Sequence, residues 1–337
     1  MNDCDDDCAD CFPGSEAAPG DGRDHDCSGA VDDLEAPIDC EPGWLEVVGS
    51  AETGDSSSVY VTGATVYVGT TAGVLVVDVS EPAAPAIAGS LEVGPVRDVA
   101  LWGALLLAAT PLGLLVVDRT DPADLVVLAG PVATGDSRGV AASVGRAYVA
   151  AREGVFVVDL STPAHPVVVE VVAEPWLHDA RDAYSFVRTF GLMPTIAVLS
   201  GSTRDHPAGG LTFLLSTRPA FASDWVRAEI PAGSRIAGHC LDTVVVAAGA
   251  GVASVFCDSR DVSWISDLAG AEGIGQACWQ GCDGCATFVA AADGLHVLDR
   301  AGPVAGTEDA RDVAAARGHA YVATAAGLRV VSLGCEP

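Results

Sequence analysis

The chain has 337 residues, half of them hydrophobic, and a formal net charge of −29 because 46 acidic residues face 17 basic ones. This charge disfavours nucleic acid and anionic membranes as partners, since binding either requires clusters of basic side chains to neutralise phosphate groups. No apolar run reaches the roughly 18 residues that a membrane-spanning helix needs, so no membrane span is expected.

Residues 1–41 form an acidic segment with fourteen acidic residues, one arginine and five cysteines. Its centre, DHDCSGAVDDLE at 24–35, matches the twelve-residue calcium loop, in which oxygen ligands alternate, a glycine makes the sharp turn and a carboxylate comes last. The predicted Ca²⁺ ligands are the side chains of Asp24, Asp26, Ser28, Asp32 and Glu35 and the carbonyl of Ala30. No helical pattern flanks the loop, so we expect a disulfide-tied calcium loop rather than an EF-hand.

The same segment resembles the MopE-type metal-binding motif of secreted bacterial proteins. The resemblance rests on DCDD at 3–6, FPGSE at 12–16 and DGRDHDCSGAVDD at 21–33, and it departs at Gly20, where a cysteine usually stands. The family is associated with copper, but the ligands here are hard oxygens apart from His25, and oxygen ligands suit Ca²⁺ better than Cu²⁺. Copper binding and a solvated acidic tail without a metal are the alternatives.

From residue 44 onward the chain repeats a glycine followed by an apolar run. Clear copies are GVLVVD at 73–78, GLLVVD at 113–118 and GVFVVD at 154–159. Weaker copies begin at Gly210, Gly251, Gly294 and Gly327, so the seven glycines are spaced by 40, 41, 56, 41, 43 and 33 residues. Runs of valine, leucine and tyrosine between Gly, Pro, Asp and Ser turns predict four strands per copy, which at this period indicates a propeller blade.

The predicted fold is an all-β, seven-bladed β-propeller over residues 44–337, preceded by the small disulfide-rich calcium-loop segment 1–41. We expect WLEVVGS at 44–50 to supply the outer strand that the seventh copy lacks, which would close the ring. The repeats resemble the LVIVD family, a bacterial extracellular propeller repeat, and the resemblance covers roughly residues 57–333. It rests on GVLVVDVSEPAAP (73–85), GLLVVDRTDPADL (113–125) and GVFVVDLSTPAHP (154–166). It implies the fold and little else.

Eleven cysteines in Gly- and Asp-rich loops are typical of secreted disulfide scaffolds, so we expect an extracellular or cell-surface protein and an incomplete start to the given sequence. A Cys40–Cys335 bridge would seal the ring covalently. The run CWQGCDGC at 278–285 contains a CxxC, but it lacks the second pair of a zinc site, which favours disulfides. A cytosolic metal-thiolate protein is the alternative.

Five arginines are predicted to surround one mouth of the central tunnel, because each stands at the start of an innermost strand. Four lie sixteen residues before a repeat glycine, and the fifth lies in the motif RDA, which matches RDV in two other blades: Arg97, Arg138, Arg235, Arg311 and Arg181. One interpretation is a site for an anionic or carboxylate ligand, since arginine offers bidentate geometry. The other is a structural ring in which these arginines pair with Asp98, Asp182 and Asp312 of neighbouring blades.

Blade four carries insertions at 175–179 (PWLHD) and 202–207 (STRDHP), which are expected on the same face as the arginines. Because loops on a rigid scaffold often carry function, His178, Asp179 and His206 are candidate ligand or metal-binding residues, with tolerated surface insertions as the alternative.

Together these patterns predict a secreted or cell-surface binding or scaffold module with Ca²⁺ as its cofactor. The expected partner is a protein or a glycan or carboxylate ligand at the propeller face. An extracellular propeller enzyme, a hydrolase or lyase using the blade-four face, is the alternative.

Overall fold

The computed structural model describes residues 44–334, apart from a set of short internal gaps. The gaps are 174–176, 189–192, 202–208, 216–225, 229–232, 241–242, 249, 257–261, 280–283, 299 and 317. The predicted calcium loop, the predicted Cys40–Cys335 bridge and the candidate residue His206 therefore lie outside the described residues, and they stay predictions.

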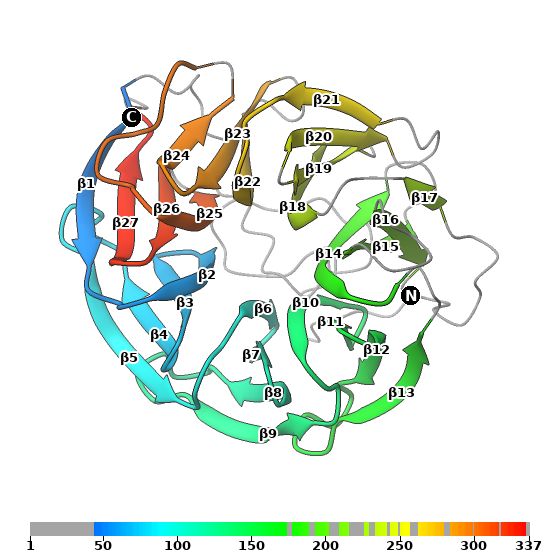
Figure 1. The fold of residues 1–337 in the computed structure, drawn as a ribbon. Coiled ribbons are helices and arrows are strands. Elements are labelled where there is room, and N and C mark those ends of the chain that lie inside the picture. The colour runs from blue at the N-terminus through cyan, green and yellow to red at the C-terminus, as the bar shows by residue number, and fades with distance from the viewer. Residues whose placement is uncertain are drawn as a thin grey trace, which may run out of the picture.

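The described residues form seven separate antiparallel sheets, which are arranged in a ring around a central axis that we call the tunnel (Figure 1). In six of the sheets the strands follow one another outward in sequence order, and in the seventh the first strand of the chain takes the outermost place. The prediction of an all-β, seven-bladed propeller is confirmed. The described residues contain no helix that could cross a bilayer.

The first three blades are the most regular. Blade 1 contains β2 (Ser56–Thr62), β3 (Thr65–Thr70), β4 (Gly73–Asp78) and β5 (Ala86–Glu92). Blade 2 contains β6 (Asp98–Trp102), β7 (Leu105–Thr110), β8 (Gly113–Asp118) and β9 (Val126–Val132). Blade 3 contains β10 (Ser137–Ser143), β11 (Arg146–Ala151), β12 (Gly154–Asp159) and β13 (Val167–Val172).

The remaining blades vary in strand length. Blade 4 contains β14 (Ala180–Arg188), β15 (Met193–Ser200), β16 (Gly210–Leu215) and β17 (Val226–Ala228). Blade 5 contains β18 (Gly233–Cys240), β19 (Thr243–Ala248), β20 (Gly251–Phe256) and β21 (Val262–Ser266). Blade 6 contains β22 (Ala271–Trp279), β23 (Gly284–Ala291) and β24 (Gly294–Val297). Blade 7 contains β25 (Ala310–Ala316), β26 (His319–Thr324), β27 (Gly327–Ser332) and β1 (Glu46–Ala51).

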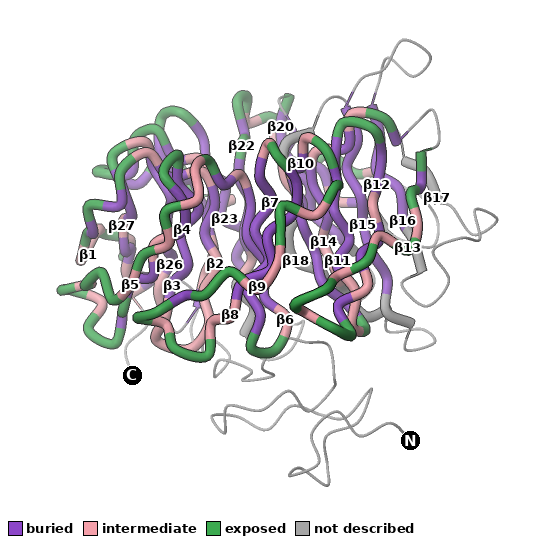
Figure 2. Tube along the Cα trace, turned by 90° about the horizontal axis from the view of Figure 1, so that it is seen from below, coloured by how far each residue is buried: buried purple, intermediate pink, exposed green. Residues whose placement is uncertain are grey.

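The hydrophobic core lies between neighbouring blades (Figure 2). Tyr67 and Val76 of blade 1 pack in one cluster with Leu101 and Leu106 of blade 2. The middle strands are buried on both faces, which explains why the sequence reads there as continuous apolar runs rather than as alternation. Full burial of each large side chain contributes roughly 1.5–3 kcal/mol, so the inter-blade contacts hold the ring together.

The repeat glycine is required by a close approach between strands. Gly113, the first residue of β8, has φ of 133°, a backbone conformation that residues with a side chain rarely adopt. A Cβ atom added there would lie 2.0 Å from the carbonyl oxygen of Val132 in the adjacent outer strand β9. The repeated glycine therefore marks the point where the third and fourth strands of a blade meet.

The ring is closed by β1, which pairs antiparallel with β27 from Glu46 opposite Ser332 to Ala51 opposite Leu328. A Cβ atom on Gly49 of β1 would lie 2.1 Å from the carbonyl oxygen of Pro82, and the corresponding distance from Gly89 of β5 to Pro122 is 2.3 Å. Because β1 meets the next blade as β5 does, it takes the place of a fourth strand. The prediction of closure by the N-terminal strand is confirmed.

Blade 6 departs from the predicted four strands. Its sheet has three strands, and the fourth is reduced to an isolated bridge between Leu295 and Val304. The short spacing of 33 residues between Gly294 and Gly327 explains the missing strand, because too few residues separate β24 from β25 for a full turn and an outer strand.

Candidate functional site at the tunnel mouth

Four of the five predicted arginines lie at the starts of innermost strands, on the face of the ring that we call the mouth. They fall into an arc across blades 2 to 4 and a pair between blades 7 and 1. We call the arc, which consists of Arg97, Asp136, Arg138, Asp179 and Arg181, the mouth arc.

The mouth arc alternates guanidinium and carboxylate groups. Arg97 Nη1 donates to Asp136 Oδ1 at 2.6 Å, and Asp136 Oδ2 lies 3.5 Å from Arg138. Arg138 also donates to Asp179, which in turn lies 3.2 Å from Arg181. These side chains are between 25% and 39% exposed, so each pair contributes only about 0–1 kcal/mol to stability and all five groups are accessible from solvent.

The fourth mouth arginine, Arg311, forms an ion pair of 2.5 Å with Asp55 at the start of blade 1. Here too an arginine at the start of one blade reaches an aspartate that immediately precedes the innermost strand of the next blade. The aspartates expected from the sequence as partners, Asp98, Asp182 and Asp312, are not the partners of these four arginines, so that part of the prediction is wrong.

Arg235 does not lie with the other four arginines. In β6, Asp98 is paired with Ala109, four residues before the repeat glycine; in β18 the residue paired with the equivalent Ala247 is Arg235. A β-bulge between Ala237 and His239 adds one residue to β18. The residue sixteen positions before the repeat glycine Gly251 therefore stands where Asp98 stands in blade 2, one residue deeper in the tunnel than Arg97. The prediction that Arg235 belongs to the mouth ring is therefore wrong.

Arg235 instead reaches across the tunnel. Its guanidinium lies 2.8 Å from Asp98 of blade 2 and 3.5 Å from Asp182 of blade 4. Its Nη2 also donates to the backbone carbonyl of Arg97 at 3.0 Å and to that of Ser57 at 3.3 Å. The side chain is 15% exposed and joins blades 1, 2, 4 and 5 through polar contacts.

Asp98, Asp182 and Asp312 each fasten their blade to the next one. Asp98 accepts the backbone N–H of Val140 at 2.8 Å, and Asp182 accepts that of Ile236 at 2.7 Å. Asp312 accepts the N–H of Val59 at 3.0 Å, which ties the last blade to the first across the ring closure. All three aspartates are buried, so these hydrogen bonds satisfy carboxylates that would otherwise be costly to remove from water.

The pKa values of Asp182, Asp312 and Arg235 are shifted from their usual values. Burial raises the pKa of Asp182 to about 7, because it outweighs the attraction of Arg235, and neighbouring Asp98 adds to the rise. Burial likewise raises the pKa of Asp312 to about 6. Burial by itself lowers the pKa of Arg235, but Asp98, Asp312 and Asp182 together outweigh burial and raise it, so Arg235 stays charged.

The blade-four candidates do not form a metal site among the described residues. His178 is exposed, whereas Asp179, its neighbour, is bound to Arg138 and Arg181. Asp179 has φ of 59°, and its backbone N–H donates to the carbonyl of Arg152 at 2.8 Å, which fixes the turn into β14. In the described part of the chain no three His, Cys, Asp or Glu side chains are grouped so as to hold a metal ion.

The hairpin of β22 and β23 brings two of the predicted disulfide cysteines into register, with Cys278 opposite Cys285. Directly opposed residues of an antiparallel pair have Cα atoms about 4.5–5.5 Å apart, which lies within the range that a disulfide spans. The disulfides expected for these cysteines, and their connectivity, stay predictions.

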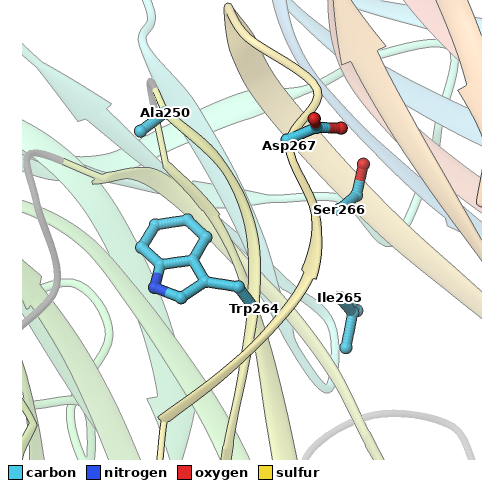
Figure 3. Close-up of a pocket in the computed structure, with 5 residues that line it drawn as sticks. All are labelled: Ala250, Trp264, Ile265, Ser266 and Asp267. Atoms are coloured by element: carbon cyan, nitrogen blue, oxygen red, sulfur yellow. The ribbon is translucent and has the colours of Figure 1, made fainter.

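A shallow pocket of about 370 Å³ lies on the outer rim of blade 5 (Figure 3). It is lined by Ala250, Trp264, Ile265, Ser266 and Asp267. The indole of Trp264 points to the side of Ala250, whereas Ser266 and Asp267 point away from the indole. Because its polar groups do not converge on the aromatic ring, this pocket is a weaker candidate than the mouth.

The sequence interpretation missed Asp55 and Asp136 as partners of the mouth arginines. Both stand in the tripeptide Gly-Asp-Ser, at 54–56 and 135–137, directly before an innermost strand. The serines of these two motifs are buried, and each hydrogen-bonds a nearby threonine, Ser56 to Thr53 and Ser137 to Thr134. This repeated tripeptide was the signal that places an aspartate at the mouth.

The model of the LVIVD repeat matches residues 53–93, 134–174 and 307–332, which correspond to blades 1, 3 and 7. The prediction of LVIVD repeats is confirmed for these segments, while the MopE-type resemblance lies outside the described residues. No curated protein matches the chain.

Solved structures with the same fold have low sequence identity. The WD40 β-propeller domain of Doa1 is 12% identical, with a TM-score of 0.56 over 86% of this chain and 97% of that one. PorZ, a surface component of the type-IX secretion system of Porphyromonas gingivalis, is 14% identical, with a TM-score of 0.57 over 87% of this chain and 38% of that one. The extracellular domain of BT4673 from B. thetaiotaomicron is 11% identical, with a TM-score of 0.60 over 85% of this chain and 39% of that one.

These similarities establish the fold, and propellers of this kind occur in extracellular and surface proteins. The chain spans about two fifths of the length of PorZ and of the BT4673 domain.

Proposed function

We propose that this protein is a secreted or cell-surface binding module that holds a carboxylate-bearing ligand, such as an acidic glycan, at the mouth arc. Its N-terminal segment would bind Ca²⁺ through Asp24, Asp26, Ser28, Ala30, Asp32 and Glu35. The observation that carries the proposal is the charge of the mouth arc, in which three guanidinium groups share two carboxylates. One positive charge is therefore left over in a protein of net charge −29.

The two ends of the mouth arc are the groups most open to a ligand. Arg97 and Arg181 each form an ion pair with a single aspartate among the described residues, whereas Arg138 lies between two. The side chains of Arg97 and Arg181 are 39% and 35% exposed. Each guanidinium carries five N–H donors, so donors remain for a bidentate carboxylate after the bond to aspartate is made.

A thermal-shift titration tests the proposal. An oligogalacturonate is expected to raise the melting temperature of the wild type in a saturable way, because a ligand at 100 times its Kd stabilises the folded state by about 2.7 kcal/mol. Arg97→Gln and Arg181→Gln should lose most of the shift. The matched control Arg329→Gln, on β27 of blade 7 and not part of the mouth arc, should keep it, and a neutral galactose oligomer should give none. No shift with the oligogalacturonate, or the same shift in all variants, would refute a carboxylate site at the mouth arc.

The enzyme alternative depends on His178, Asp179 and His206 acting together at the blade-four face. Asp179 already accepts hydrogen bonds from Arg138 and Arg181, so it orients two arginines rather than a histidine. This arrangement favours ligand binding over acid–base catalysis at the blade-four face.

A further inference from the structure

The centre of the propeller contains more buried acid than base. Asp98, Asp182, Asp312 and Arg235, which we call the tunnel cluster, place three carboxyl groups around one guanidinium. The three aspartates are at most 8% exposed. If every group were ionised, the tunnel cluster would hold two uncompensated negative charges away from bulk water, which is strongly unfavourable.

Among the residues that the structure describes, no second cation at this level offsets the excess. The other three innermost strands carry uncharged residues at the same register position, Ser58, Gly139 and Gly273. The guanidinium groups that adjoin the cluster in sequence, those of Arg97, Arg181 and Arg311, are directed to aspartates at the mouth. The backbone carbonyl of Arg97, by contrast, accepts a hydrogen bond from Arg235. All seven innermost strands have now been considered at this register position. The excess negative charge must therefore be balanced within the tunnel cluster.

Neighbouring innermost strands are in close contact at the level of the tunnel cluster. A Cβ atom on Gly139 would lie 2.6 Å from the Cα of Asp182, and one on Gly273 would lie 2.5 Å from the Cα of Asp312. These contacts leave no space for water between the two pairs of strands.

The carboxyl groups are not equivalent in their bonds. Asp98 has one oxygen on Arg235 and the other on the N–H of Val140. The ion pairs of the described residues include Arg235 with Asp98 and Asp182 but not with Asp312. Asp312 is held by the backbone N–H of Val59.

We propose that the tunnel cluster is a proton-binding site, in which Asp182 and Asp312 take up protons as the solution becomes mildly acidic and thereby tighten the ring. Protonation converts three carboxylates around one guanidinium into a neutral Asp98–Arg235 pair flanked by two neutral acids. Release of these protons restores like-charge repulsion between the aspartates of blades 2, 4 and 7. The same aspartates hold these blades to their neighbours through hydrogen bonds.

The perturbed titration agrees with this geometry. The folded-state pKa values of about 7 for Asp182 and about 6 for Asp312 both lie above the value near 3.8 of an unperturbed aspartate. The folded protein therefore binds more protons than the unfolded chain between roughly pH 4 and 7, so stability falls as the pH rises through this window. Each such group makes the unfolding equilibrium constant rise by about tenfold per pH unit within its window.

Two measurements on the full chain test the proposal. In ¹³C NMR of aspartate-labelled protein, two carboxyl signals should titrate near pH 6 and 7, and they should disappear one at a time in Asp312→Asn and Asp182→Asn. In urea unfolding between pH 4.5 and 7, Asp312→Asn should flatten the rise of the unfolding constant by up to about tenfold per pH unit below pH 6.

The exposed Asp309→Asn serves as the control, because it removes a charge from the same blade outside the tunnel and asparagine tolerates the positive φ found there. It should keep the wild-type slope, which also contains the repulsion within a highly acidic protein. The proposal is overturned if all aspartate carboxyls titrate near pH 4, or if Asp312→Asn and Asp309→Asn have the same slope. The NMR titration of the wild type decides the question even if Asp312→Asn does not fold.

Discussion

Replacement of Arg235 by methionine separates the tunnel cluster from the mouth arc. Methionine has a similar length and fills the tunnel, but it removes the charge and every hydrogen-bond donor. Asp98 and Asp182 lose their ion pairs, and the backbone carbonyls of Ser57 and Arg97 lose a donor.

The expected cost follows from burial. Removing one partner of a buried ion pair typically destabilises a protein by about 3–5 kcal/mol, because the remaining charge is left unpaired. The loss should approach this range at pH 8, where the aspartates are ionised. It should be smaller at pH 5.5, because burial has raised the pKa of Asp182 to about 7 and of Asp312 to about 6, so both carry a proton there.

Urea unfolding followed by circular dichroism at both pH values measures this difference. The matched control is Arg138→Met, whose ion pairs are partly exposed and worth about 0–1 kcal/mol, with little dependence on pH in this range. The reasoning is refuted if the free energy of unfolding of Arg235→Met stays within about 1 kcal/mol of the wild-type value at pH 8. It is also refuted if Arg235→Met and Arg138→Met lose the same free energy at both pH values.

Three further predictions concern other parts of the chain. Asp24→Ala combined with Asp26→Ala should abolish Ca²⁺ binding in calorimetry and leave the melting temperature of the propeller unchanged; retained calcium affinity would exclude the loop. Deleting residues 1–52 should lower the melting temperature far more than deleting 1–38, since only the longer deletion removes β1, and equal melting temperatures would contradict closure by β1. Gly113→Ala should cost at least about 1–3 kcal/mol in chemical unfolding, because alanine is strained at this φ and its Cβ meets a carbonyl oxygen; a neutral result would show that β9 can move away.

The blade count, the order of the strands and the ring closure could be predicted from the sequence because each rests on local and repeated signals. The repeat glycine is such a signal, since Gly113 adopts a backbone conformation that other residues avoid. The three-stranded sheet of blade 6 could also have been foreseen from the short spacing between Gly294 and Gly327.

The site was harder to predict because it depends on register. A single bulge in β18 moves Arg235 from the mouth into the tunnel, and nothing in the local sequence around Gly238 specifies that bulge uniquely. The partners Asp136 of Arg97 and Asp179 of Arg138 come from the next blade, about 40 residues away. The choice between Asp98 and Asp136 for Arg97 could therefore be made only in three dimensions.

The pairing of β1 with β27 has a consequence for the order in which the protein is made. The first strand of the propeller to leave the ribosome pairs with β27 of the final blade, so β1 stays without its partner strand while about 280 residues are added. An unpaired strand is open to mispairing with other chains, and this risk lasts until β27 has been made. Closure of the ring therefore depends on the arrival of the final blade.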